Sequence, residues 1–343
     1  MRILILGANG FIGNSLVSRI LKTTDWEVVG MDLEQDRFSR EVFEHPRFLF
    51  QLGDLAVNHE WIEMQIKRSD AVLPLAAKAI PTDYLENPMG VFELNFEENL
   101  KVIRSCVKHG KRLIFPSTSE VYGMCKDDVF DEESSHFTLG PINKHRWIYS
   151  CAKQMLDRVI HAYGLQQNFD YTIIRPFNWI GPKLDRIHPE KMIKSRVVTQ
   201  FMDAVLFNRP ISLVDGGKQK RCFIYIDDGI DALMKIIANK NGKASRQIFN
   251  IGNPYNELSI AKLVQVIVDL YQKHPRSKQH PFTAGVRKIA SAKYYGKGYQ
   301  DVSYRKPAIA KSKKLLGWQP QIDITTALSH TLNSFVGMIE TTK

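Results

Sequence analysis

Short apolar runs alternate with amphipathic segments through the first half of the chain. Residues 3–6 are continuously apolar, as expected of a strand buried on both faces. Helical spacing of apolar positions follows directly, at Ile12, Leu16, Val17, Ile20 and Leu21. Further strands are predicted at 27–31, 48–52, 71–75, 112–115, 171–175 and 247–251, and the clearest helices at 91–109 and 149–163. This alternation predicts an α/β fold with a doubly wound parallel sheet.

The pattern changes after Arg175. Prolines at 176, 182, 189 and 210 interrupt it, and short amphipathic pieces follow. We therefore predict one domain from residues 1–177 and 223–253, and a smaller, discontinuous substrate domain from 178–222 and 254–343. Residues 274–306 are basic, rich in Tyr and Gly and poor in regular pattern, so they predict a long ordered loop.

Bulk composition narrows the class of protein. Of the 343 residues, 44% are hydrophobic and 24% charged, which is typical of a soluble globular protein. No apolar run approaches the roughly 20 residues of a membrane span, and the N-terminus lacks a signal-peptide layout. The four cysteines are far apart without metal-type spacing, so we expect free thiols, no metal site and a cytoplasmic location.

The net charge is +11. Such a charge could indicate nucleic-acid binding, but no nucleic-acid-binding motif accompanies it. We favour a basic surface that attracts an anionic small substrate, and expect neither a nucleic-acid nor a membrane partner.

A glycine loop follows the first strand. Gly7, Gly10 and Gly13 stand in G-x-x-G-x-x-G spacing, before a helix predicted to begin near Phe11 and Ile12. Glycine permits the tight turn and lets backbone N–H groups approach a pyrophosphate, towards which the helix directs its positive N-terminus. A glycine loop alone is a weak signal, but its position between strand and helix predicts a Rossmann-type dinucleotide site.

Asp32 ends the second predicted strand. A carboxylate there can accept hydrogen bonds from the adenosine ribose and repel a 2′-phosphate, which favours NAD over NADP, although the nearby Arg37 weakens that preference. Asp32 could otherwise be a plain strand-end turn residue. Asp54, after the third strand, could meet the adenine or could equally be a turn aspartate.

Tyr149 and Lys153 are candidates for proton transfer. They are four residues apart and so share one helix face. A nearby ammonium and the charge of a nicotinamide would lower the pKa of Tyr149, which could then take a proton from a substrate hydroxyl. Ser119, after the fifth strand, could hold the same oxygen. The alternative is a partly buried helix tyrosine with a solvated lysine.

The same Tyr-x-x-x-Lys spacing recurs at Tyr122 and Lys126. That pair begins in a strand-end loop, with Gly123 next, and no helical stripe continues from it. Tyr149 by contrast begins a helix with a regular apolar side. We therefore interpret Tyr122 and Lys126 as a chance match.

The chain resembles the extended short-chain dehydrogenase/reductase family of nucleotide-sugar enzymes over essentially its whole length. The motifs that carry the likeness, besides those above, are Arg175-Pro176-Phe177-Asn178, the 215–221 segment, Tyr225-Ile226-Asp227-Asp228 and the 315–320 segment. The resemblance implies NAD as cofactor, a UDP-sugar as substrate and a homodimer formed through the helices near 95–109 and 149–163.

Within that family the chain is most similar to UDP-glucuronic acid decarboxylases, including the decarboxylase domain of a bifunctional polymyxin-resistance enzyme. The segments 116–124, 143–149, 216–222, 294–301 and 305–307 carry this narrower likeness. Its size resembles the stand-alone UDP-4-keto-pentose and UDP-xylose synthases. Ser119 stands where sugar 4,6-dehydratases of the family have an acidic aspartate, and 4-epimerases usually lack a glutamate at position 120. Cys222 replaces an aspartate common among extended members.

By resemblance, residue roles divide into three sets. The catalytic set is Thr118, Ser119, Glu120, Tyr149, Lys153 and Arg305. The cofactor set is Gly7, Gly10, Phe11, Ile12, Gly13, Asp32, Asp54, Leu55, Leu75, Ala76, Ala77, Tyr149 and Lys153. The substrate set is Ala79, Tyr84, Arg146, Asn178, Lys218, Lys220, Arg221 and Tyr299. Lys218, Lys220 and Arg221 suit a pyrophosphate, with the 227–228 acidic pair as their family partner, or else form a solvated turn.

The implied reaction is oxidation of UDP-glucuronic acid at C4 followed by loss of carbon dioxide. The product is UDP-4-keto-pentose if NADH leaves and UDP-xylose if it stays, and the likeness to the polymyxin-resistance enzyme favours the ketopentose. The alternatives are a nucleotide-sugar 4-epimerase or 4,6-dehydratase of the same family. A non-catalytic nucleotide sensor is a further alternative, which the presence of both Tyr149 and Lys153 disfavours.

Overall fold

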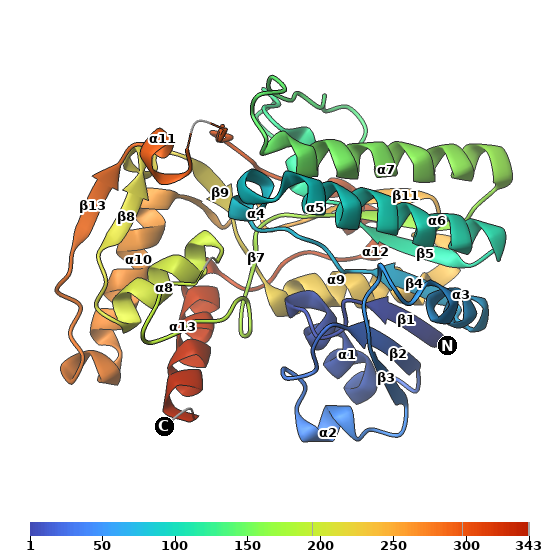
Figure 1. Ribbon diagram of the computed structural model, residues 1–343, viewed down its shortest axis with the longest axis horizontal. Helices are drawn as coiled ribbons and strands as arrows, with labels where there is room; N and C mark the ends of the chain where they lie inside the picture. The colour runs from blue at the N-terminus through green and yellow to red at the C-terminus, as the bar shows by residue number, and fades with distance from the viewer. Residues whose placement is uncertain (194, 297, 342–343) are drawn as a thin grey trace.

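A seven-stranded parallel sheet forms the centre of the protein, as a computed structural model of residues 1–193, 195–296 and 298–341 shows (Figure 1). Its strand order is β11-β6-β5-β4-β1-β2-β3. The strands are β1 (Arg2–Leu6), β2 (Glu27–Asp32), β3 (Phe48–Leu52), β4 (Ala71–Pro74), β5 (Arg112–Pro116), β6 (Tyr171–Pro176) and β11 (Gln247–Ile251). All seven predicted strands and the doubly wound α/β fold are thus confirmed.

Helices cover both faces of this sheet, which explains the continuous apolar runs (Figure 1). Ile3 and Ile5 of β1 face the core shared with α1 (Phe11–Thr23) and α9 (Ile226–Ala238). Leu4 and Leu6 face the opposite core, which α3 (His59–Arg68), α6 (Asn99–Lys108) and α7 (Trp147–Gln167) complete. The strand order changes direction between β1 and β4. In this architecture ligands bind beside such a switch point, outside the carboxyl ends of the strands.

The predicted helix at 91–109 is three helical pieces. After α4 (Pro81–Glu86), α5 (Pro88–Phe92) runs into a π-helical turn at Glu93–Glu98 and then into α6. The side chain of Asn95 in that turn is buried and hydrogen-bonds both backbone groups of Lys78. The other predicted helix, 149–163, lies within α7, which begins two residues earlier at Trp147.

A second group of elements lies beside the sheet (Figure 1). β8 (Ile211–Val214) pairs with β13 (Val286–Ile289), and β9 (Lys220–Cys222) pairs with β12 (Glu257–Ser259). The helices α8 (Val197–Leu206), α10 (Ile260–Lys273) and α13 (Ile324–Thr341) pack against them. The smaller helices are α2 (Arg40–Phe43), α11 (Ser291–Tyr294) and α12 (Ala310–Leu316).

The prediction that 274–306 is a continuous loop was wrong. The segment contains a 3₁₀ turn at Pro275–Lys278, β13 and α11. β13 is a strand because it pairs with β8, some 75 residues earlier in the chain, and its own exposed side chains give no alternating pattern.

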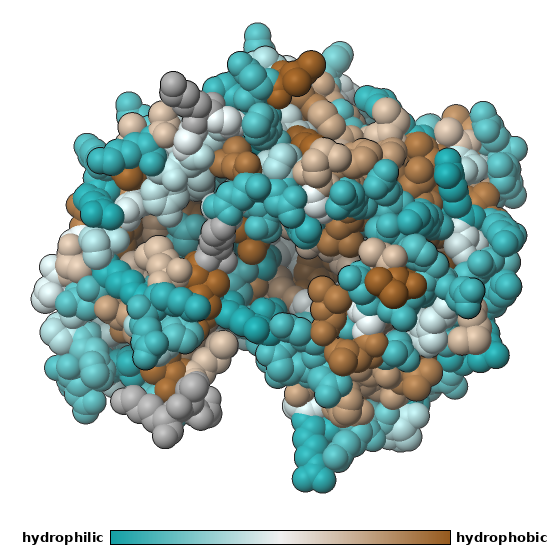
Figure 2. All heavy atoms as spheres, in the orientation of Figure 1, coloured by the Kyte–Doolittle hydropathy of each residue, from teal (hydrophilic) through white to brown (hydrophobic). Residues whose placement is uncertain are grey.

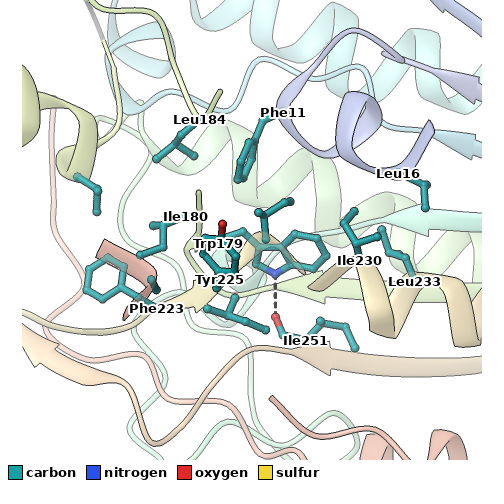
Figure 3. Close-up of a cluster of buried hydrophobic side chains, with 14 of the residues drawn as sticks. Phe11, Leu16, Trp179, Ile180, Leu184, Phe223, Tyr225, Ile230, Leu233 and Ile251 are labelled. Atoms are coloured by element: carbon teal, nitrogen blue, oxygen red, sulfur yellow. Dashed lines mark hydrogen bonds between the residues drawn. The ribbon is translucent and has the colours of Figure 1, made fainter. Parts of the chain in front are cut away.

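A buried apolar cluster joins the two groups of elements. The short strands β7 (Trp179–Ile180) and β10 (Ile224–Tyr225) pair in parallel beside the sheet. Trp179 packs among apolar side chains from both sides, and its indole N–H donates a 3.0 Å hydrogen bond to the Ile251 carbonyl of β11 (Figure 3). This cluster fixes how the second group stands against the ends of the sheet strands.

The cysteines at 106, 125, 151 and 222 are all free, and no cluster of His, Cys, Asp or Glu suitable for a metal occurs among the described residues. Within the same residues, no helix has the length and apolarity needed to cross a bilayer.

Tyr122 of the second Tyr-x-x-x-Lys match is a core residue. It is fully buried, and its hydroxyl donates to the Asn250 side chain at 2.9 Å while accepting from Arg175 at 2.9 Å. Burial raises the pKa of Tyr122 to about 12. Lys126 is exposed, so the pair does not form a common site.

We expect Tyr122→Phe to lower the free energy of unfolding by about 1–3 kcal/mol, because it leaves buried partners unsatisfied. Lys126→Ala should leave stability unchanged, since the side chain is in solvent. Urea denaturation of both variants measures this. A Tyr122→Phe protein of full stability that has lost turnover would contradict the structural role.

Candidate functional site

A cleft of about 560 Å³ lies between the sheet and the second group of elements. Figure 2 shows a recess near the middle of this face, with hydrophilic side chains along much of its rim. Its walls come from the glycine loop, the ends of β4, β5 and β6, the first turns of α7, helix α8, and residues within 294–295 and 299–305. It lies at the carboxyl edge of the sheet, as the fold predicts.

The glycine loop has the shape that a pyrophosphate requires. Gly7 has φ +92°, and a Cβ there would lie 2.6 Å from the Ala76 nitrogen. A Cβ on Gly13 would lie 2.2 Å from the Gly7 carbonyl oxygen, so neither position admits a larger residue. Helix α1 starts after Gly10 with no side-chain cap, which leaves its first N–H groups directed at the cleft. These features fit a dinucleotide.

Asp32 is held at the end of β2 by the loop beside it. Its carboxylate accepts from the backbone N–H groups of Asn9 and Leu33, both at 2.8 Å. Burial raises the pKa of Asp32, although these hydrogen bonds and the charge of Arg37 act in the opposite direction. The remaining lone pairs of the carboxylate suit a ribose diol.

The predicted cofactor residues fall into two groups, those that line the cleft and those that do not. Gly7, Gly10, Phe11, Ile12, Gly13, Leu75 and Ala77 line the cleft. Asp32, Asp54, Leu55 and Ala76 are not part of the lining. Asp54 closes a turn by accepting from the Ala56 N–H at 2.9 Å, and Leu55 is buried in the core under β2. The adenine role considered for Asp54 stays a prediction.

Tyr149 lies in the first turns of α7, buried and stacked on Tyr84 with ring centroids 4.9 Å apart. Burial raises the pKa of Tyr149, while a hydrogen bond with Thr118 and the charges of Arg196 and Arg305 act to lower it. Ser119 and Thr118 follow β5 and line the same cleft. The structure thus brings the predicted hydroxyl groups together on one wall.

Lys153 is fully buried one turn further along α7. Its ammonium donates to the Pro116 carbonyl at 2.9 Å and lies 4.5 Å from the centroid of the Phe115 ring. Burial lowers the pKa of Lys153 to about 8, although the charge of Asp157 opposes this shift. A lysine with this pKa is poised to change protonation near neutral pH.

Glu120 is the centre of a buried ion network. Its carboxylate accepts from Arg305 at 2.5 Å through one oxygen and from Arg146 through the other. Arg305 also reaches the Ser119 hydroxyl at 3.4 Å. Burial alone would raise the pKa of Glu120, but the charges of Arg146 and Arg305 outweigh it and lower the pKa to about 2. Glu120 is therefore ionised under all ordinary conditions.

Asp301 extends the network to the second group of elements. It accepts from Arg221 at 2.8 Å and lies 3.9 Å from Arg146. Arg146 in turn donates to the Gln300 carbonyl, and its guanidinium is 5.4 Å from the centroid of the Tyr299 ring. The 299–305 segment is thereby held over the cleft by charge.

The predicted basic triplet does not act as a unit. Arg221 is buried and lines the cleft, but Lys218 and Lys220 are exposed and outside its lining. Lys220 pairs with Glu257 at 3.7 Å. The expected partnership with the 227–228 acidic pair was wrong, because Asp228 accepts from the backbone N–H groups of Gln321 and Ile322 instead.

The other predicted substrate residues, Ala79, Tyr84, Arg146, Asn178 and Tyr299, all line the cleft. The sequence interpretation missed Arg196, which lines the cleft with its guanidinium 5.5 Å from the centroid of the Phe11 ring, and it missed Tyr294 and Tyr295. No motif marks Arg196. Its side chain is oriented by Asp185, which accepts from it at 2.7 Å.

Comparison with known proteins gives two kinds of match. The model of a family described as "NAD dependent epimerase/dehydratase family" matches residues 3–252. The chain is also similar to PbgP3 protein from Burkholderia pseudomallei, whose crystal structure is known. The two sequences are 47% identical, the match covers 99% of this chain and 97% of that chain, and the TM-score is 0.88.

More distant structures share the fold. UDP-glucose 4-epimerase from Thermotoga maritima is 21% identical over 99% of this chain and 100% of its own, with a TM-score of 0.80. UDP-glucuronic acid 4-epimerase from Bacillus cereus, solved with UDP-glucuronic acid and NAD, is 23% identical over 98% of this chain and 100% of its own, with a TM-score of 0.79.

We expect Glu120→Gln to lower the free energy of unfolding by about 3–5 kcal/mol near pH 7, because two buried guanidinium groups lose their counter-charge. Glu133→Gln is the control, since the Glu133 side chain is 69% exposed and pairs with Lys311. The folded pKa of Glu120 is depressed, so its contribution is present above the unfolded pKa of 4.5 and is lost as the pH falls towards 2. Denaturant titrations should show that the difference in free energy of unfolding between Glu120→Gln and wild type becomes smaller over that pH range. A difference that does not change with pH would refute the stabilising role of the Glu120 charge.

Lys153→Met should stabilise the cofactor-free protein at pH 7. The folded pKa of about 8 lies below the unfolded value of 10.5, so the buried ammonium costs stability below pH 8, and the cost vanishes as the pH rises to 10.5. The shift corresponds to roughly 3 kcal/mol, from which the lost hydrogen bond to Pro116 subtracts about 1. We expect a gain of roughly 1–3 kcal/mol at pH 7 that shrinks by pH 10, measured against wild type at each pH. Lys153→Met destabilised at pH 7 would contradict this.

Proposed function

Since the chain belongs to the NAD-dependent epimerase/dehydratase family, we propose that it is a UDP-glucuronate decarboxylase that uses NAD to oxidise UDP-glucuronic acid and release UDP-4-keto-pentose or, after re-reduction, UDP-xylose. The observation that carries this proposal is the position of Arg305. It stands beside Ser119, with its charge balanced by Glu120, and lines the same cleft as Tyr149. A sugar carboxylate bound there would meet a fixed cation next to the group that oxidises its ring.

When bound, NAD⁺ accepts the hydride that leaves C4 of the sugar and adds a positive charge to the cleft. Tyr149 takes the proton of the C4 hydroxyl, for which its pKa must fall towards the working pH. The cations already present, Arg196 and Arg305, act to lower the pKa of Tyr149, against burial and the charge of Glu120. Thr118 and Ser119 hold the same oxygen, and Lys153 supports the tyrosine from the next turn of α7.

The ketone formed at C4 makes the C6 carboxylate a β-keto acid. The bond between C5 and C6 then breaks, carbon dioxide leaves, and the electron pair becomes an enolate whose oxygen the hydroxyl groups of Tyr149 and Ser119 stabilise. Arg305 orients the carboxylate before it leaves. The proton that completes C5 comes from water, because Glu120, with its pKa of about 2, holds no proton to give.

The role of Glu120 is therefore to position charge. It anchors Arg305 and Arg146 on opposite sides of its carboxylate, and the 299–305 segment comes with them. Three arginines and two carboxylates leave this network with one excess positive charge, and Arg221, paired with Asp301, lines the cleft where a pyrophosphate of the UDP-sugar would bind. The predicted homodimer would use α6 and α7, and Met155 and Leu165 of α7 are exposed.

Incubation of the pure protein with UDP-glucuronic acid and NAD⁺ tests the proposal. We expect loss of carbon dioxide in the product mass, with stoichiometric NADH absorbance if the ketopentose is released and without it if UDP-xylose forms. Tyr149→Phe should reduce turnover by about 10²–10⁴-fold, while Tyr163→Phe on the same helix should not. An unchanged product mass would replace this proposal with an epimerase.

A further inference from the structure

Two segments from opposite sides of the cleft meet next to Asp32. One is residues 34–37, which follow β2 and precede α2. The other is residues 183–186, which follow β7 and precede α8. They are about 150 residues apart in the chain, so their meeting is a property of the fold.

The inner contacts between them are reciprocal. The Arg37 guanidinium donates to the Lys183 carbonyl at 3.0 Å, and the Lys183 ammonium donates to the Arg37 carbonyl at 2.6 Å. The same ammonium donates to the Asn14 side chain of α1 at 3.0 Å. Lys183 has φ +62°, an unusual value for a residue other than glycine. This backbone is held in place by the bonds that its own side chain makes.

An outer pair of contacts adds to them. Arg186 donates to Asp36 at 2.7 Å and to Glu34. Asp36 is tied in turn to the glycine loop, because the Asn9 side chain donates to it at 3.0 Å and accepts from the Arg37 N–H at 3.0 Å. The two segments and the cofactor loop are therefore one connected set of polar contacts.

The contacts lie over the end of the cleft at which the dinucleotide loop stands. Arg37, Leu184 and Asp185 line the cleft together with Gly10 and Phe11; Leu184 and Phe11 are labelled in Figure 3. A dinucleotide held by the glycine loop, with its ribose at Asp32, would have to pass these segments to leave.

We propose that residues 34–37 and 183–186 form a clasp that retains NAD(H), so that the reduced cofactor dissociates slowly compared with turnover. If the proposed function holds, on which this consequence rests, the retained NADH returns its hydride to C4 of UDP-4-keto-pentose, Tyr149 supplies the proton, and NAD⁺ and UDP-xylose result. The clasp residues thus decide which of the two products leaves.

The test is the rate at which NADH leaves the purified protein, followed by stopped-flow fluorescence after displacement with excess NAD⁺. Lys183→Met removes both ammonium hydrogen bonds and keeps the length of the side chain. Arg186→Ala removes the outer ion pairs. Lys311→Met is the matched control, because Lys311 also makes a long-range ion pair, with Glu133, but lies on α12, outside both of these segments.

We expect Lys183→Met to raise the dissociation rate about tenfold, the effect of losing one or two charge-assisted hydrogen bonds. Arg186→Ala should raise it less, and only at low salt, because Arg186, Glu34 and Asp36 are all about half exposed. Lys311→Met should leave the rate unchanged even if its melting temperature falls. An unchanged rate in both clasp variants, or an equal rise in the control, would overturn the clasp.

The product assay separates this inference from the proposed function. With UDP-glucuronic acid, the wild-type protein should form UDP-xylose without net NADH, in contrast to the ketopentose that the sequence resemblance favours. Lys183→Met should shift the products towards UDP-4-keto-pentose with NADH. If no carbon dioxide is lost, the decarboxylase proposal fails, while the NADH dissociation rates still decide whether the clasp exists. If wild type releases NADH stoichiometrically, retention is refuted.

Discussion

The pairing of one buried carboxylate with two arginines holds the working face of this protein together. Glu120 follows strand β5, Arg146 stands at the start of α7, and Arg305 lies near the other end of the chain. Each charge alone would be costly to bury, and together they are tolerated because each supplies the other's counter-charge. Tyr149 and Ser119 are placed by the same elements, so the geometry of the hydroxyl groups depends on the ion network.

Local features of the sequence were enough for the sheet and for half of the site. Each of these features can be recognised within a short stretch of sequence. They are a strand buried on both faces, a loop that only glycine can form, and a helical pair at i, i+4. Tyr122 shows the limit of such short sequence motifs. Its motif is identical to that of Tyr149, and only the helical stripe after Tyr149 distinguishes a side chain at the cleft from one buried against Arg175 and Asn250.

What could not be predicted depends on contacts between distant residues. Three neighbouring cations, Lys218, Lys220 and Arg221, look alike in sequence, yet only Arg221 lines the cleft. Lys220 and Arg221 are successive residues of β9, so their side chains point to opposite faces, and Asp301, 80 residues away in the chain, pairs with Arg221. Arg196 belongs to no motif, and its orientation comes from Asp185. β13 likewise becomes a strand only because β8 provides a partner. Propensity and spacing carry no information about such partners.

The two ends of the cleft are closed by contacts of different strength. The ion network around Glu120 is almost fully buried, so it is neither screened by salt nor easily opened, and it suits a site whose geometry must stay fixed through the chemical step. The contacts near Asp32 are graded: Lys183 is partly buried, while Arg186, Glu34 and Asp36 are about half exposed. A closure of that kind can hold a bound molecule for many turnovers and still open without disturbing the catalytic groups, because the two sets of contacts share no residue.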